Sequence, residues 1–79
     1  MEVTEVTIED KINYWKTKLK VGSEWLTVEL DPQTILITDI EYDQESGSVV
    51  VEYITDESSH MIYFIPVDQF IDGRFIRKN

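Results

Sequence analysis

The stretch that predicts the longest strand of the protein is Thr34-Ile35-Leu36-Ile37-Thr38-Asp39-Ile40-Glu41-Tyr42-Asp43. Most of its residues are β-branched or aromatic, which is typical of strands. Successive side chains of a strand point to opposite faces. The face predicted to meet the core carries Leu36, Thr38, Ile40 and Tyr42. Ile35 and Ile37 are then expected on the opposite face, near where a helix could cover them.

Turn-forming residues divide the rest of the chain into further short strands. Toward the C-terminus we expect a turn at Gln44–Gly47, a third strand at Ser48–Ile54, a fourth at His60–Ile65, a 3₁₀ turn at Val67–Phe70 and a last strand at Arg74–Arg77. Toward the N-terminus, Glu24–Leu30 predicts a first strand. It ends at Asp31-Pro32, because proline has no amide hydrogen to donate to a neighbouring strand.

Ahead of these strands the spacing of apolar residues changes to that of a helix. The residues that would form one apolar stripe are Ile8, Ile12, Trp15 and Leu19. Thr7 and Asp10 have the spacing of a capping box, and lysines gather at the other end, where the helix dipole favours cations. We therefore predict an amphipathic helix over Ile8–Lys20, closed by Gly22, and an arm or short strand over residues 1–7.

The order of a helix, four strands, one helical turn and a short last strand resembles that of SH3-like small barrels. The motifs that carry the resemblance are Val49-Val50-Val51-Glu52-Tyr53, Ile65-Pro66-Val67-Asp68-Gln69-Phe70 and Arg74-Phe75-Ile76. They are also similar to small phage and prophage barrel proteins. The resemblance implies an α+β, mostly β fold in one domain, with a five-stranded antiparallel barrel over residues 23–77 that closes and leaves few open edges.

Composition limits the classes of protein to consider. The chain of 79 residues contains no cysteine, which excludes disulfides and thiolate metal sites. No apolar run approaches the roughly 18 residues that a membrane helix needs. The first residues are acidic and lack the apolar segment of a secretory signal. We expect a cytoplasmic protein without a cofactor and without membrane contact.

Charge is distributed unevenly along the chain. The net charge is −9, and residues 21–73 carry twelve carboxylates without a single lysine or arginine. In the densest part of this segment, Asp39, Glu41 and Asp43 occupy alternate positions. A strand would place them on one face about 6.8 Å apart. We expect a row of like charges that no cation within the segment offsets.

The sequence gives little basis for catalysis or metal binding. The single histidine, His60, lies within five residues of Asp56, Ser58 and Ser59 in a predicted turn, whereas a catalytic triad is assembled by the fold from separate positions. The three glycines stand too far apart for a phosphate-binding loop. The acidic run lacks glycine where an EF-hand loop requires it. We predict neither an enzyme nor a metal site.

Direct nucleic-acid binding requires lysine and arginine, which are confined to the predicted helix and the C-terminal end. The acidic segment instead fits a basic partner. We predict a non-catalytic acidic binding module that engages a nucleic-acid-binding protein, as phage inhibitors that mimic DNA do. An acidic uracil-DNA glycosylase inhibitor of similar size is alike in composition. The residues predicted to bind the partner are Asp39, Glu41, Asp43, Glu45, Glu52, Asp56 and Glu57.

Two alternatives remain open. A self-associating structural or assembly protein would pair through an exposed strand edge or through Ile35 and Ile37. A Tudor-like barrel would hold a cationic peptide among aromatic rings. The rings available for such a cage are Trp25, Tyr42, Tyr53, Tyr63 and Phe64. Strand alternation directs the three tyrosines toward the core, so we expect them to pack there. A monomer or a weak homo-oligomer is compatible with these patterns.

Overall fold

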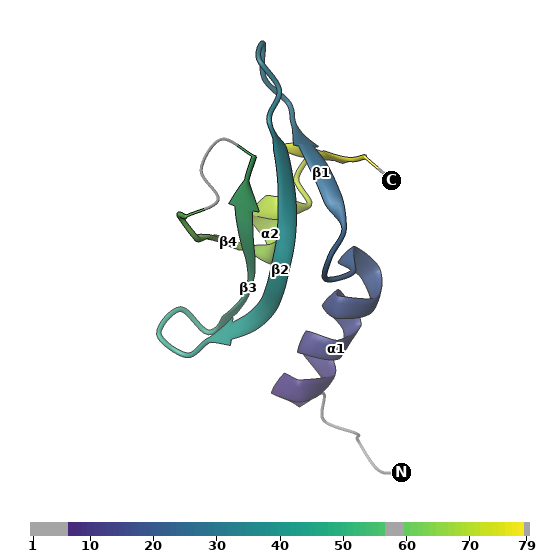
Figure 1. The fold of residues 1–79 in the computed structure, drawn as a ribbon. Coiled ribbons are helices and arrows are strands. Elements are labelled where there is room, and N and C mark those ends of the chain that lie inside the picture. The colour runs from purple at the N-terminus through teal and green to yellow at the C-terminus, as the bar shows by residue number, and fades with distance from the viewer. Residues whose placement is uncertain (1–6, 57–59, 79) are drawn as a thin grey trace.

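Figure 1 shows the computed structural model, which describes residues 7–56 and 60–78. Its elements are α1 (Ile8–Leu19), β1 (Glu24–Thr27), β2 (Thr34–Asp43), β3 (Ser48–Thr55), β4 (Tyr63–Pro66), α2 (Val67–Phe70) and β5 (Phe75–Arg77). The strands form one antiparallel sheet in the order β4-β3-β2-β1-β5. The predicted α+β, mostly β class is confirmed. The sheet ends in β4 on one side and β5 on the other, so it is open and the predicted barrel closure is not confirmed.

Helix α1 begins with the predicted capping box. The amide of Asp10 donates to the Thr7 hydroxyl over 3.1 Å, and the amide of Thr7 donates to the Asp10 carboxylate over 3.3 Å. The helix ends one residue earlier than predicted, because Lys20 itself turns to a φ of 63° while its amide still donates to the Lys16 carbonyl. Gly22, with a φ of 92°, then lies in the turn that the Ser23 amide closes by donating to the Lys20 carbonyl over 3.1 Å. The rest of the predicted arm lies outside the described residues.

A β-bulge in β2 corrects the predicted division of its side chains. Ile37 lies opposite Tyr53 and Asp39 lies opposite Glu52, so Thr38 is an extra residue in β2. An extra residue shifts the alternation of a strand by one position. The core face of β2 therefore carries Ile35 and Ile37 before the bulge and Ile40 after it, all fully buried. The prediction was right for Ile40 and wrong for Ile35 and Ile37. It was also wrong for Leu36 and Thr38, which are only partly buried on the opposite face.

Both helices contribute to a core on one face of the sheet. Its buried residues are Leu19, Ile35, Ile37, Ile40, Val49, Val51, Ile65, Val67 and Phe70. Among the partly buried residues packed against them are Tyr42 and Tyr53, as strand alternation predicted. The Phe70 ring stacks on Phe75 of β5 at 4.5 Å between centroids, and the Trp25 edge meets Phe70 at 5.0 Å. The fold thus has a core face under both helices and an opposite face, here called the outer face.

Buried Ser23 joins α1 to the sheet. Its hydroxyl donates to the Leu19 carbonyl over 2.7 Å and accepts from the Trp25 indole over 2.8 Å. Backbone bonds from Gly22 and to Ser23 then attach this segment to Ile37 of β2. The connection satisfies the polar groups of a helix end that lies against the core.

Several predicted element boundaries are corrected by local hydrogen bonds. Strand β1 stops at Thr27, because the Thr27 amide and hydroxyl bond to the backbone of Gln33 and close the loop there. Strand β4 pairs with β3 only from Tyr63 onward. The turn at Val67–Phe70 is of α type and not of 3₁₀ type, since the Ile71 amide reaches the Val67 carbonyl four residues earlier. The last strand begins at Phe75 instead of Arg74.

Candidate functional site

The outer face of the sheet carries the side chains that alternate with the core residues. Those of β2, β3 and β4 include Leu36, Asp39, Glu41, Asp43, Val50, Glu52, Ile54 and Phe64. Neither helix lies on this face, because the residues that α1 and α2 bury belong to the core on the other side. Within the described residues, the outer face is therefore a solvent-facing surface that combines carboxylates with apolar side chains.

The bulge and the strand register bring Asp39, Glu41 and Glu52 together. Asp39 lies directly opposite Glu52, and Glu41 is the next outward residue of β2. Partial loss of hydration, a hydrogen bond to Asp39 and repulsion from Asp39 and Glu52 raise the pKa of Glu41 above its ordinary 4.5, although Lys16 lowers it. We call these three residues the carboxylate cluster. Their mutual repulsion is the direct electrostatic consequence of the fold.

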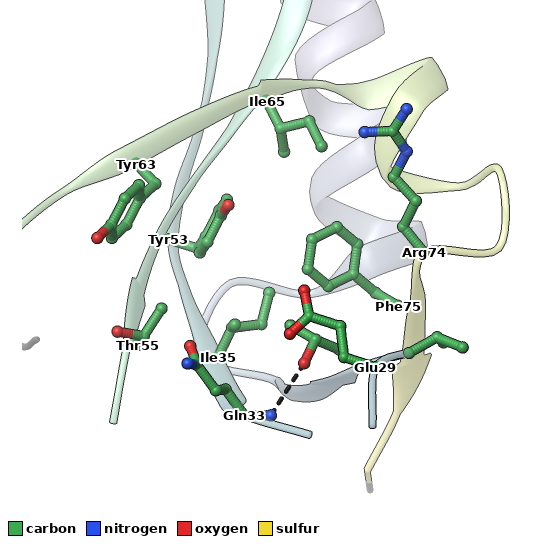
Figure 2. A pocket seen from close by; sticks show the side chains of 11 residues that line it. Glu29, Gln33, Ile35, Tyr53, Thr55, Tyr63, Ile65, Arg74 and Phe75 are labelled. Carbon is green, nitrogen blue, oxygen red and sulfur yellow. Dashed lines mark hydrogen bonds between the residues drawn. The ribbon is translucent and has the colours of Figure 1, made fainter. Parts of the chain in front are cut away.

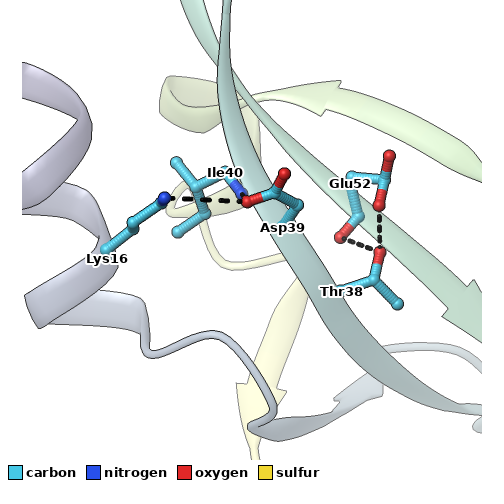
Figure 3. A network of polar contacts seen from close by, with 5 residues as sticks. All are labelled: Lys16, Thr38, Asp39, Ile40 and Glu52. Carbon is cyan, nitrogen blue, oxygen red and sulfur yellow. Dashed lines mark hydrogen bonds and ion pairs between the residues drawn. The ribbon is translucent and has the colours of Figure 1, made fainter. Parts of the chain in front are cut away.

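Two members of the cluster have polar partners, which Figure 3 shows. Asp39 accepts from the Ile40 amide over 2.8 Å and forms an ion pair with Lys16 at 3.8 Å. Glu52 accepts from the Thr38 hydroxyl over 2.5 Å. The predicted lack of an offsetting cation concerned only residues 21–73, whereas the cation that lies beside the row is Lys16 of α1. Both ends of the ion pair are about two-fifths exposed, so its attraction is well screened by water.

Asp43 and Glu45 lie at the hairpin turn beyond the cluster. The Asp43 carboxylate accepts from the Glu45 amide over 3.2 Å and from the Ser46 hydroxyl over 2.8 Å. Gly47 completes the turn with a φ of 70° and donates its amide to the Asp43 carbonyl. Asp43 therefore shapes the turn as an aspartate commonly does. Glu45 is exposed to solvent in this turn.

Asp56 is separated from the carboxylate cluster. It follows β3 at the end opposite the hairpin turn, where its amide donates to the Thr34 carbonyl. Leu36 and Ile54, an outward cross-strand pair, lie between it and the cluster. Glu57 lies outside the described residues. The predicted partner-binding residues thus occupy three places: the cluster, the turn and the far end of β3.

Two shallow depressions on the outer face were not anticipated. One, of about 360 Å³, is lined by residues that include Val50, Phe64, Glu41 and Asp43. The other, of about 220 Å³, has Leu36 and Ile54 with Glu24 and Asp56. Recognising these groups required the register of β2, β3 and β4. The sequence carries no signal for that register beyond the alternation within each strand.

A larger pocket of about 400 Å³ opens on the core side of the sheet, and Figure 2 shows its lining. Tyr53 and Tyr63 stack with centroids 5.4 Å apart, and burial, followed by Tyr63, raises the pKa of Tyr53. Glu29 turns its carboxylate toward the pocket, whose lining also includes Arg74. Opposite charges at one mouth reduce the preference of the pocket for cations over anions.

The five aromatic residues considered for a Tudor-like cage are dispersed. Tyr53 and Tyr63 lie in this pocket with their rings stacked on each other. Trp25 packs against Phe70 in the core, and Phe64 lies more than half exposed on the outer face. These rings therefore lie in separate parts of the described structure and do not form one cage.

Comparison with known proteins does not assign this chain to a family. No protein-family model matches the chain, and neither curated proteins nor solved structures give a match. Among the residues that the structure describes, no three His, Cys, Asp or Glu side chains are grouped so as to hold a metal ion. No helix in that part of the chain is long and apolar enough to cross a bilayer. The physical character of the outer face is therefore the basis for a functional proposal.

Proposed function

We propose that this protein is a non-catalytic binding module whose outer face engages a basic protein in the cytoplasm. The observation that carries the proposal is the convergence of Asp39, Glu41 and Glu52 on a face without a helix. Partial loss of hydration, a hydrogen bond to Asp39 and repulsion from Asp39 and Glu52 raise the pKa of Glu41 in the free protein. A cationic partner would relieve that repulsion on binding, and this relief would contribute favourably to the free energy of binding.

A nucleic-acid-binding protein is the class of partner that this charge favours. Such proteins present lysines and arginines arranged to neutralise phosphates. A net charge of −9 steers the module toward these surfaces, and the only lysine paired with the cluster in the described residues is exposed Lys16. The proposal includes inhibition by mimicry of DNA. In that case duplex DNA and the module compete for one basic groove.

The proposal is tested with a matched pair of triple variants. D39N/E41Q/E52Q neutralises the cluster, and E29Q/D31N/D68N neutralises three exposed carboxylates elsewhere. Each changes the net charge from −9 to −6, because three negative charges are removed. Binding of an arginine-rich peptide is measured by calorimetry at two salt concentrations. We expect the cluster variant to lose about tenfold or more in affinity and the control to lose about threefold or less.

Equal losses in both variants would reject the proposal, because binding would then follow net charge alone. Circular dichroism and urea unfolding establish that both variants remain folded. Binding should weaken as salt rises, since charges on a surface are screened over about 8 Å at physiological ionic strength. An affinity that did not depend on salt would likewise contradict an electrostatic interface.

Self-association is a second candidate, favoured by the apolar side chains that the outer face leaves exposed, Phe64 among them. A dimer through this face would bring two carboxylate clusters together, which repulsion opposes. Sedimentation at two protein and two salt concentrations separates the candidates. An oligomer that persists at low salt favours assembly, and a monomer favours the basic partner.

A further inference from the structure

The two depressions of the outer face share one chemical design. Each is lined by two outward apolar side chains, here called its floor, which are Leu36 and Ile54 in one and Val50 and Phe64 in the other. Each is also lined by two carboxylates. They are Glu24 and Asp56 in the first depression and Glu41 and Asp43 in the second. An apolar floor beside carboxylates is complementary to lysine and arginine, whose aliphatic stems lie on apolar surface while the charged ends stay at the rim.

The second depression also presents an aromatic ring. Phe64 of β4 is 57% exposed and lies opposite Glu52 of β3 in the strand register. An arginine guanidinium binds favourably over an aromatic face, and nearby carboxylates strengthen that preference. Two independent features of this depression, the Phe64 ring and the two carboxylates, thus favour a cation.

The spacing of the depressions follows from β3, which crosses both. Val50 and Ile54 are outward residues four positions apart on this strand, a separation of about 13 Å at 3.3 Å per residue. Glu52 lies midway and faces Asp39 across the strands. The outer face therefore offers three cation-accepting positions in a line, at intervals of about 6.6 Å. The same interval separates alternate side chains of an extended peptide.

We infer that the outer face binds an extended segment of the basic partner with lysine or arginine at positions i, i+2 and i+4. This inference rests on the proposed function and specifies the form of the ligand. The outer side chains occupy the two depressions, and the middle one meets Asp39 and Glu52. Charge complementarity selects this occupant over a second copy of the chain, since two chains each carry a net charge of −9.

Two peptides of equal length and composition test the spacing. One carries three arginines at alternate positions, and the other carries three consecutive arginines among the same neutral residues. Consecutive side chains of an extended peptide point to opposite sides, so the second peptide directs at most two arginines toward the protein. We expect the alternating peptide to bind about tenfold more tightly at physiological salt, by calorimetry. Equal affinities overturn the inference.

Variants of the apolar floors provide the second readout. Phe64→Thr and Ile54→Thr leave every charge in place and put a β-branched residue at each strand position, so the sheet is preserved. Each should weaken the alternating peptide by about threefold to tenfold. Ile71→Thr, at a similarly exposed position outside the sheet, is the matched control and should have no effect. Loss in the control equal to that in the floor variants overturns the inference.

The outcomes separate this inference from the proposed function. If both peptides bind equally and both lose affinity in D39N/E41Q/E52Q, the acidic interface stands and the spacing is wrong. If neither peptide binds, or neither responds to that variant, both proposals fail. If the protein alone sediments as a dimer that Phe64→Thr dissociates, the outer face binds a second copy, and the assignment to a partner segment is overturned.

Discussion

Replacing Glu41 by glutamine is expected to stabilise the protein, although the residue is exposed and lies in a regular strand. Glu41 has two carboxylate neighbours, Asp39 on its own strand and Glu52 on the next. Glutamine keeps the shape of the side chain and removes the charge. The glutamine amide can also donate a hydrogen bond to Asp39. The Glu41 carboxyl group can do so only when it is itself protonated.

The size of the effect follows from Coulomb's law. Alternate side chains of a strand lie about 6.8 Å apart. Two unit charges at that distance in water repel by about 0.6 kcal/mol, and physiological salt reduces this to about 0.3 kcal/mol. The repulsion of Glu41 by its two carboxylate neighbours is partly offset by Lys16. The net repulsion is then roughly 0.3 kcal/mol at physiological salt and roughly 0.7 kcal/mol at low salt. For a chain of this size, these values raise the Tm by about 1–2 °C and about 3–5 °C.

The dependence on pH has a definite sign. Because the folded protein raises the pKa of Glu41 above 4.5, it takes up a proton where the unfolded chain is still ionised. The wild type therefore gains stability as the pH falls through this window, and it loses the same amount as the pH rises again. Glutamine has no such titration. The advantage of the variant should be full at pH 7, should shrink as the pH falls toward 4.5 and should vanish only at pH values below the pKa of the unfolded chain.

Urea unfolding of Glu41→Gln, of the wild type and of Glu29→Gln measures these differences. Glu29 lies in the exposed connection after β1, so its replacement removes the same charge away from the cluster. The reasoning would be refuted if Glu41→Gln were less stable than the wild type at low salt. It would also be refuted if Glu29→Gln raised the free energy of unfolding as much as Glu41→Gln does. A stabilisation by Glu41→Gln that increased as the pH fell toward 4.5 would refute it as well.

Two further predictions concern the fold that positions the cluster. Ser23→Ala should lower the free energy of unfolding by about 1–3 kcal/mol, because the partly buried Trp25 indole loses its hydrogen-bond acceptor. Chemical unfolding measures this loss. The control variant Thr17→Ala removes an exposed hydroxyl and should lower the free energy of unfolding by less. Deletion of Thr38 should leave the protein folded with every other side chain on its present face, at a cost of about 1 kcal/mol for the lost bond to Glu52. An unfolded deletion variant, seen by circular dichroism, would mean that the fold requires the bulge.

The sequence was most informative where local interactions decide the structure. The capping box at Thr7, the bounds of β2 and the turn after Asp43 depend on neighbours within a few residues, and these predictions are confirmed. The division of β2 into faces failed at Thr38. Strict alternation cannot reveal an extra residue, because a bulge is defined only by the partner strand. The predicted apolar face was therefore right after the bulge and wrong before it.

The candidate site was predictable in part for the same reason. Asp39 and Glu41 follow the bulge, so their alternation held, and they share a face as predicted. Their approach to Glu52 depends on the pairing of β2 with β3, which the composition of either strand leaves open. The ion pair with Lys16 depends on where α1 packs. Contacts of this kind join residues far apart in the chain, so the periodicity of the sequence does not predict them.

Strand β1 is short, and its limited pairing with β2 has a consequence for the solubility of the protein. Strand β1 pairs with Thr34–Leu36, so the acid-bearing part of β2 has β3 on one side and α1 beside the other, as Figure 1 shows. A strand edge without a strand neighbour can join sheets from separate molecules, and a covering helix and charged side chains are common safeguards against this. The carboxylates that we assign to recognition therefore also protect the protein from precipitation. Variants that neutralise them should gain thermal resistance while they lose solubility in concentrated solution.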